Sequence, residues 1–257
     1  KLINKNCIYD MEITAITLNS NGQRYETFLQ NNSHLKIKHF KAIKGSNLLK
    51  NDILRENLAT KELISNKKIF SPGGIGCAAS HKKIWQQCLL GNQSILVLED
   101  DCYTHPQIKE FIDFNEEILN ANDICFFGLH TNSVLRTSSP QGLEFTSIFF
   151  NPAYPNPNWI KNAFSKTDIK NIIFNKLIHG FGTFAYYITP KGAKKLINLI
   201  FPLSLKTTKI NFLNDRMPLF SIDRAGCAIY REINALVTYP YLAYNQNITK
   251  STTEPNS

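Results

Sequence analysis

Three adjacent carboxylates, Glu99, Asp100 and Asp101, are the residues of this chain best suited to chemistry. They follow the apolar run ILVL at 95–98, which is typical of a buried strand. Carboxylates packed together raise one another's proton affinity, so a fold that gathers them needs a cation nearby. Carboxylate oxygens suit hard divalent ions, and the triplet therefore predicts a site for Mn²⁺ or Mg²⁺ that could in turn hold a diphosphate. A solvated loop is the alternative interpretation of an acidic triplet, but ligands of open α/β sheets bind at the carboxyl ends of strands.

A glycine-rich run, SPGGIGC at 71–77, precedes this strand. It matches neither the P-loop nor the GxGxxG pattern. Its glycines, including Gly76, predict a tight turn or a close backbone approach to a ligand, before a helix whose N-terminus could receive an anion. Ser80 and His81 lie on that helix, and we expect structural roles for both. His81 is on the apolar face, where it would form a hydrogen bond with a neighbouring loop.

Two further candidates lie in the second half of the chain. His179 opens the glycine-flanked turn HGFGTF, where contact with a ligand and a structural role are both open. Asp215 could act as a general base on an acceptor hydroxyl, although an ion pair with Arg216 or a helix cap is equally compatible with its sequence. Asp223 and Glu232 are weaker candidates for the same role.

The elements that position these residues follow from apolar periodicity. We expect strands at 13–18, 37–43, 94–100, 123–129, 182–189 and 235–244, the last broken at Pro240, with helices at 23–31, 47–66, 75–90 and from Pro190. Residues 130–178 look irregular, as a binding loop or lid would. The β-α-β-α opening predicts an α/β fold with a mostly parallel central sheet.

The composition describes an ordinary globular protein, with 43% apolar and 19% charged residues in 257. We expect a single domain over 1–257, with an N-terminal extension at 1–10 and a mobile tail at 247–257. No run reaches the roughly 20 apolar residues of a membrane span. Six cysteines without a CxxC pair or zinc spacing indicate reduced thiols in a cytoplasmic protein. The net charge of +9 reflects either solubility or attraction to an anionic surface, and no nucleic-acid-binding module is present.

The run GGIGCAASHKKIW (73–85) followed by LEDD (98–101) resembles glycosyltransferase family 25, the lipopolysaccharide-biosynthesis family that includes bacterial β-1,4-galactosyltransferases. Looser similarity extends over about residues 11–250 through ITLNS with Arg24, KAIKG at 41–45, GTFAY at 182–186 and Tyr239-Pro240 with Gln246. The resemblance implies a GT-A-like, Rossmann-type nucleotide-binding fold.

The family likeness also implies an activity: inverting, metal-dependent transfer of a hexose, galactose from UDP-galactose, to a lipo-oligosaccharide. The protein would then be cytoplasmic and peripheral to the inner membrane, with a UDP-sugar donor and an anionic lipo-oligosaccharide acceptor as partners. By the same likeness Asp101 would bind the metal, Glu99 and Asp100 would reach the ribose or a metal-bound water, and Asp215 would be the catalytic base. We further expect cofactor binding by Arg24, Gly76, Ser80 and His81, and substrate binding by His179, Gly182 and Thr183.

Two other classes of function stay open. A non-catalytic sugar- or nucleotide-binding module with a decayed site is one, although the intact acidic triplet argues against decay. A metal-dependent nucleotidyl transferase or hydrolase is the other. The sequence argues against this second class, because it contains neither a P-loop nor a second acidic cluster for a two-metal site.

Overall fold

The computed structural model describes residues 11–139, 141–149, 155–210 and 215–246. The expected extension at 1–10, the tail at 247–257 and part of the segment 130–178 expected to be irregular therefore lie outside the described residues. The strands are β1 (Glu12–Thr17), β2 (Lys38–Lys41), β3 (Ile95–Glu99), β4 (Cys102–Thr104), β5 (Ile124–Phe126), β6 (Val134–Ser138), β7 (Glu144–Ile148), β8 (Ile173–His179), β9 (Ala185–Ile188), β10 (Thr207–Ile210), β11 (Asp215–Pro218), β12 (Ala235–Tyr239) and β13 (Ala243–Asn245). The helices are α1 (Gln23–Asn31), α2 (Lys50–Arg55), α3 (Lys61–Ser65), α4 (Pro72–Gly91), α5 (Ile108–Phe114), α6 (Glu116–Ala121), α7 (Pro157–Ser165), α8 (Pro190–Ile200) and α9 (Ile222–Ile229), with short 3-10 turns at Gly45–Asn47 and Ile169–Asn171.

A nine-stranded mixed sheet forms the centre of the fold, in the order β2-β1-β3-β9-β5-β12-β8-β6-β7. The pairs β1–β2, β1–β3 and β5–β12 are parallel, whereas every other described pair in this sheet is antiparallel. The fold class α/β is therefore confirmed, but the expectation of a mostly parallel sheet is wrong. One reason is β9, which lies between β3 and β5 and runs against both. The other is the segment expected to be irregular, which adds β6, β7 and β8 to the sheet in antiparallel pairs.

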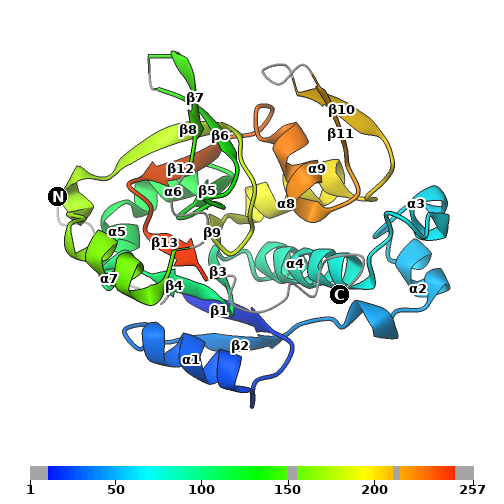
Figure 1. Ribbon diagram of the computed structural model, residues 1–257, viewed down its shortest axis with the longest axis horizontal. Helices are drawn as coiled ribbons and strands as arrows, with labels where there is room; N and C mark the ends of the chain where they lie inside the picture. The colour runs from blue at the N-terminus through cyan, green and yellow to red at the C-terminus, as the bar shows by residue number, and fades with distance from the viewer. Residues whose placement is uncertain (1–10, 140, 150–154, 211–214, 247–257) are drawn as a thin grey trace.

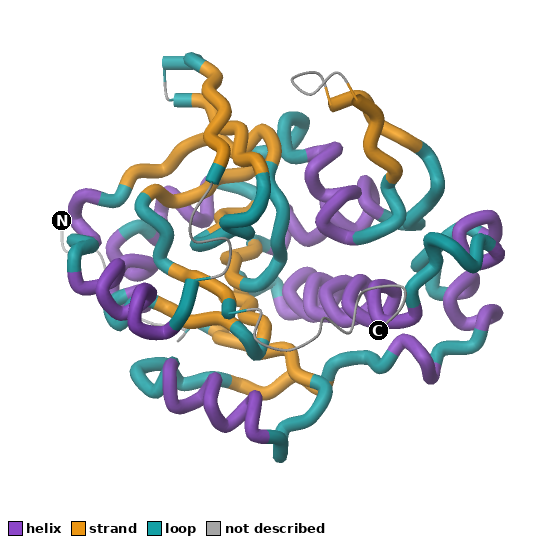
Figure 2. The backbone as a smooth tube through the Cα atoms, viewed as in Figure 1, coloured by secondary structure: helices purple, strands orange, loops and turns teal. Residues whose placement is uncertain are grey.

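Helices cover both faces of this sheet (Figures 1 and 2). The side chains of β3 alternate, so Ile95 and Val97 join the apolar core under α4, α8 and α9, while Leu96 and Leu98 join a second core with α1 and α5. A strand buried on both faces needs a continuous apolar sequence, which explains the run ILVL.

Helix α4 places the glycine-rich run differently from the prediction. The helix already begins at Pro72, because the Ser71 hydroxyl accepts a hydrogen bond from the Gly74 amide (3.2 Å), and Asn92 ends it in the left-handed conformation. The glycines therefore lie inside the first turns of the helix rather than in a turn before it. A Cβ on Gly76 would collide with the backbone of Ile43 and Gly45, so this glycine permits a close approach of the chain itself.

Other local predictions had mixed outcomes. Helix α1 and the break at Pro240 are confirmed, and Thr189 caps α8 by accepting from the Gly192 amide (3.2 Å). The helix expected over 47–66 is instead two short helices, α2 and α3, separated by Asn57 at a φ of 50°. Residues 130–178 are not irregular, since they contain β6, β7, α7 and β8.

No helix in the described part of the chain is long and apolar enough to cross a membrane. The five described cysteines are free thiols, as expected.

Candidate active site at the carboxyl end of β3

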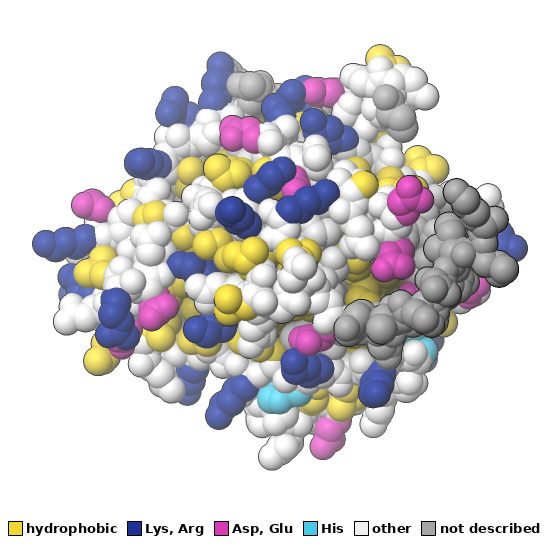
Figure 3. All heavy atoms as spheres, turned by 180° about the vertical axis from the view of Figure 1, so that it is seen from behind, with side chains coloured by type: hydrophobic (Ala, Val, Ile, Leu, Met, Phe, Trp, Pro, Cys, Tyr) yellow, Lys and Arg dark blue, Asp and Glu magenta, His cyan; other side chains and the backbone are white. Residues whose placement is uncertain are grey.

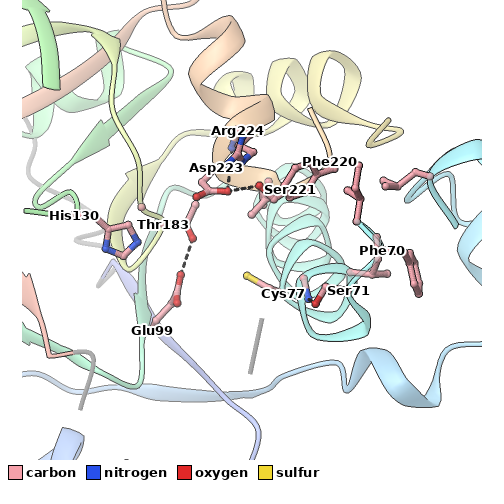
Figure 4. Close-up of a pocket in the computed structure, with 16 residues that line it drawn as sticks. Phe70, Ser71, Cys77, Glu99, His130, Thr183, Phe220, Ser221, Asp223 and Arg224 are labelled. Atoms are coloured by element: carbon pink, nitrogen blue, oxygen red, sulfur yellow. Dashed lines mark hydrogen bonds between the residues drawn. The ribbon is translucent and has the colours of Figure 1, made fainter. Parts of the chain in front are cut away.

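Two adjoining cavities meet at the end of β3. The first, here called the β1–β2 cavity, has a volume of about 660 Å³ and lies between the ends of β1 and β2, the start of α1 and the start of α4. The second, the α9 cavity, has a volume of about 290 Å³ and lies between α4, the turn before β9 and the start of α9. Ser71, Cys77 and Glu99 line both cavities (Figure 4 shows the α9 cavity). This is the sheet edge at which open α/β folds bind ligands.

Glu99 is held as a carboxylate at this junction. The Thr183 hydroxyl donates a hydrogen bond to its Oε1 (2.7 Å), and His81 Nε2 lies 3.3 Å from the same oxygen. Burial by itself raises the pKa of Glu99, but the neighbouring His81 ring and Thr183 hydroxyl outweigh it and lower the pKa to about 2. Glu99 therefore brings a fixed negative charge to both cavities.

Asp100 and Asp101 lie beside Arg24 of α1. The Arg24 Nη2 atom is 2.7 Å from Asp100 Oδ1 and 3.4 Å from Asp101 Oδ2. Burial and the charge of Glu99 raise the pKa of Asp101 to about 7, against the opposing charge of Arg24. Among the described residues, Asp101 Oδ1 is buried without a hydrogen-bond partner. The carboxyl groups of Glu99 and Asp101 thus differ in pKa because their surroundings differ.

Ser80 and His81 line the β1–β2 cavity, whereas Gly76 packs against the backbone of Ile43 and Gly45 behind it. The Ser80 hydroxyl donates to the Gly76 carbonyl (2.7 Å) and accepts from the Ile43 amide (2.8 Å), which ties α4 to the segment after β2. His81 is buried, and its Nδ1 is hydrogen-bonded to the Tyr186 hydroxyl (2.7 Å), to which Trp85 Nε1 also donates (2.9 Å). The structural roles favoured by the sequence are present, but His81 bonds a strand rather than a loop.

The predicted substrate-binding and catalytic residues are only partly brought together. Gly182 and Thr183 line the α9 cavity, and Gly182 has a φ of 117°, which favours glycine. His179 lies at the end of β8 and lines neither cavity; burial and the charge of Arg136 lower its pKa to about 4. Asp215 is exposed at the start of the β10–β11 hairpin, accepts from the Arg216 amide (2.7 Å) and lines neither cavity. The structure therefore does not place His179 or Asp215 with the acidic triplet.

Several cavity residues have no role in the expectation from the family likeness, although the sequence offers Asp223 as a weaker candidate for the base. Asp223 and Arg224 enter the α9 cavity from the start of α9, opposite Glu99, and His130 faces it beside Thr183 (Figure 4). Asp223 Oδ1 accepts from the Ser221 hydroxyl (2.6 Å) and the Arg224 amide (3.0 Å). Cys77 also lines the α9 cavity and lies one helical turn before His81. This Cys-x₃-His spacing brings two potential metal ligands to one helix face, although it is neither a CxxC pair nor a zinc-finger spacing.

An α/β sheet with an acidic strand end, a helix start beside it and two adjoining cavities is an arrangement suited to binding a ligand at the carboxyl ends of the strands. The chain belongs to glycosyltransferase family 25 (LPS biosynthesis protein), whose family model matches residues 11–211. No curated protein matches the chain significantly. Membership of this family implies a glycosyltransferase of lipopolysaccharide biosynthesis, with a sugar donor and a lipopolysaccharide acceptor.

Proposed function

We propose that this protein transfers a hexose, galactose from UDP-galactose, onto a lipo-oligosaccharide acceptor with inversion at the anomeric carbon and with help from Mn²⁺ or Mg²⁺. The observation that carries the proposal is Glu99, a carboxyl group with a lowered pKa that lines two adjoining cavities of unequal size. A transferase needs two such compartments, one for the donor and one for the acceptor, which meet at the reacting atoms.

The β1–β2 cavity is suited to the nucleotide donor in a GT-A-like arrangement. It is the larger of the two, and it is lined by the ends of the parallel strands β1 and β3, the Arg24 guanidinium and the first residues of α4. The N-terminus of a helix and an arginine both attract diphosphate oxygens. The Asp100 carboxylate in the same wall is a suitable acceptor for ribose hydroxyls.

Asp101 lines neither the β1–β2 cavity nor the α9 cavity but lies beside Arg24 at the edge of the first, and it offers an oxygen that suits a divalent cation. Its buried Oδ1 lacks a hydrogen-bond partner in the described part of the chain, and such an oxygen gains from a cation. Ions such as Mg²⁺ are commonly held by one or two carboxylates together with substrate phosphates. When bound, the ion would supply Lewis-acid stabilisation of the leaving diphosphate.

The α9 cavity is suited to the acceptor. Phe70 and Phe220 offer apolar faces for a sugar ring, and Arg224, whose guanidinium lies 4.6 Å from the centre of the Phe220 ring, adds positive charge for an anionic saccharide.

The base that removes the proton of the acceptor hydroxyl is best assigned to Asp223. As the acceptor oxygen bonds to the anomeric carbon, the bond to the diphosphate breaks and Asp223 takes the hydroxyl proton. Asp223 lines the α9 cavity with Glu99, whereas Asp215, the candidate from sequence, is exposed on a hairpin. Asp215 nevertheless stays a prediction that a substitution can test.

A cytoplasmic location at the inner membrane surface belongs to the same proposal. The net charge of +9 and the lysines and arginines spread over the face in Figure 3 support contact with anionic lipid and acceptor. Since the basic side chains on this face are not gathered into one stripe, a nucleic acid is a poor partner.

A donor panel tests the proposal. The protein is incubated with a set of UDP-sugars and a lipo-oligosaccharide acceptor, with and without Mn²⁺, and released UDP is measured. We expect UDP-galactose to give the fastest release, dependent on both acceptor and Mn²⁺. Binding of a UDP-sugar without any release would instead identify a non-catalytic module.

A further inference from the structure

Three potential metal ligands of different chemistry converge where the two cavities meet. The Cys77 sulfur, a His81 ring nitrogen and a Glu99 carboxylate oxygen all lie within 4.8 Å of one another. Cys77 and His81 are one turn apart on α4 and therefore share the face that packs towards β3. A set of one sulfur, one nitrogen and one oxygen suits Zn²⁺ and similar transition metals, whereas Mg²⁺ and Mn²⁺ prefer oxygen alone.

The His81 ring is oriented as a metal ligand would be. Its side chain is 1% exposed, and Nε2 finds no hydrogen-bond partner among the described residues. Its other nitrogen, Nδ1, is fixed by the Tyr186 hydroxyl (2.7 Å), and metal-bound histidines usually have such a partner on the second nitrogen. A buried ring nitrogen that makes no hydrogen bond of standard geometry, and that lies 3.3 Å from a carboxylate oxygen with a thiol also nearby, is suited to share a cation with them.

The distances are compatible with tetrahedral coordination. His81 Nε2 lies 3.3 Å from Glu99 Oε1. Two ligands that each lie about 2.0–2.1 Å from a zinc ion at the tetrahedral angle are roughly 3.3–3.4 Å apart. The Thr183 hydroxyl holds the carboxylate in place by its hydrogen bond to Oε1 (2.7 Å), and the Cys77 sulfur lies within 4.8 Å of both other ligand atoms.

We propose that Cys77, His81 and Glu99 bind a Zn²⁺-class transition-metal ion whose fourth coordination position opens into the two adjoining cavities. Three protein ligands and one open position are typical of catalytic rather than structural zinc sites. Binding releases the Cys77 thiol proton to solvent. The site does not depend on the sugar donor, which distinguishes it from the oxygen site at Asp101, and it does not rest on the proposed glycosyl transfer.

Cobalt spectroscopy of the full chain tests this site. Co²⁺ is added to metal-free protein without nucleotide, and the thiolate-to-cobalt charge-transfer band is recorded. We expect one equivalent of Co²⁺ to produce the band, Zn²⁺ to displace it, and Cys77→Ser to abolish it. Cys88→Ser, a matched buried thiol on the same helix, should retain the band. Absence of the band in the unmodified protein, or its survival in Cys77→Ser, would overturn the proposal.

A second measurement needs no variant and so does not depend on how well Cys77→Ser folds. The unmodified protein is alkylated with and without Zn²⁺, and the modified cysteines are mapped by mass spectrometry. Zn²⁺ should slow alkylation of Cys77 by at least about tenfold, since a ligand thiolate is occupied by the metal. Equal Cys77 alkylation in both samples would contradict a metal site even if the protein transfers sugar.

Discussion

The β1–β2 cavity and the α9 cavity share Glu99 but are made from different parts of the chain. The first is built from β1, α1, the segment after β2 and the start of α4, all inside the family match at 11–211. The second is closed by residues 220–224 at the start of α9, which lie beyond that match. The β1–β2 cavity is therefore made wholly from the part of the chain that the family model matches, whereas the α9 cavity combines matched residues with a segment outside the match.

The largest expected effect separates the two candidate bases. Asp223→Asn should lower turnover by roughly 100-fold or more, the typical contribution of a general base, with donor binding unchanged. Asp215→Asn, the matched substitution outside both cavities, should leave turnover close to that of the unmodified protein. Steady-state kinetics with saturating donor measure both variants. A large loss in Asp215→Asn and none in Asp223→Asn would move the acceptor site away from the α9 cavity.

A pH effect on stability should arise outside both cavities, at His179. Because its pKa in the fold is lowered to about 4 by burial and Arg136, the native state resists protonation. The stability should be fully present above an unfolded-state pKa of about 6.5 and fall by up to about 3 kcal/mol as the pH drops to about 4. Urea unfolding at a series of pH values measures this loss. His179→Asn should flatten the slope, while His39→Asn, at an exposed position on β2, should not. An unchanged slope in His179→Asn would show that another group is responsible.

A smaller effect on the free energy of unfolding is expected at Thr183, where the two cavities meet. Thr183→Val removes the hydrogen bond to Glu99 while keeping the shape of the side chain, so the free energy of unfolding should fall by about 2 kcal/mol. Thr183→Ser keeps the hydroxyl and serves as the control. Chemical denaturation gives both values. If the two variants were equally stable, the Thr183 hydroxyl would not be what holds Glu99.

The elements around the β1–β2 cavity could be predicted largely from local sequence. The apolar run ILVL predicts β3 and the position of the triplet at its end, and the spacing of Cys77, His81 and Trp85 predicts the buried face of α4. These signals are local because strand and helix periodicities are set by neighbours a few residues apart. Even here the glycines were misinterpreted, since close packing of Gly76 against residues 43–45 depends on a contact between distant segments.

The α9 cavity could not be predicted in the same way. Nothing in GTFAYYIT indicates that β9 pairs antiparallel with both β3 and β5, because pairing direction is decided by the path of the whole chain. Asp223 lines the same cavity as Glu99 because α9 packs against α4 and α8, and the sequence around Asp223 supports it only as a weaker base candidate.

The most direct test of the central claim is the coupling between cation and nucleotide at the end of β3. UDP binding is measured calorimetrically with and without Mn²⁺, for the unmodified protein and for Asp101→Asn, with folding checked by circular dichroism. The account predicts that Mn²⁺ tightens UDP binding at least about tenfold in the unmodified protein, equivalent to about 1.4 kcal/mol, and has no effect in Asp101→Asn. Equal UDP affinity with and without Mn²⁺ in the unmodified protein would contradict it.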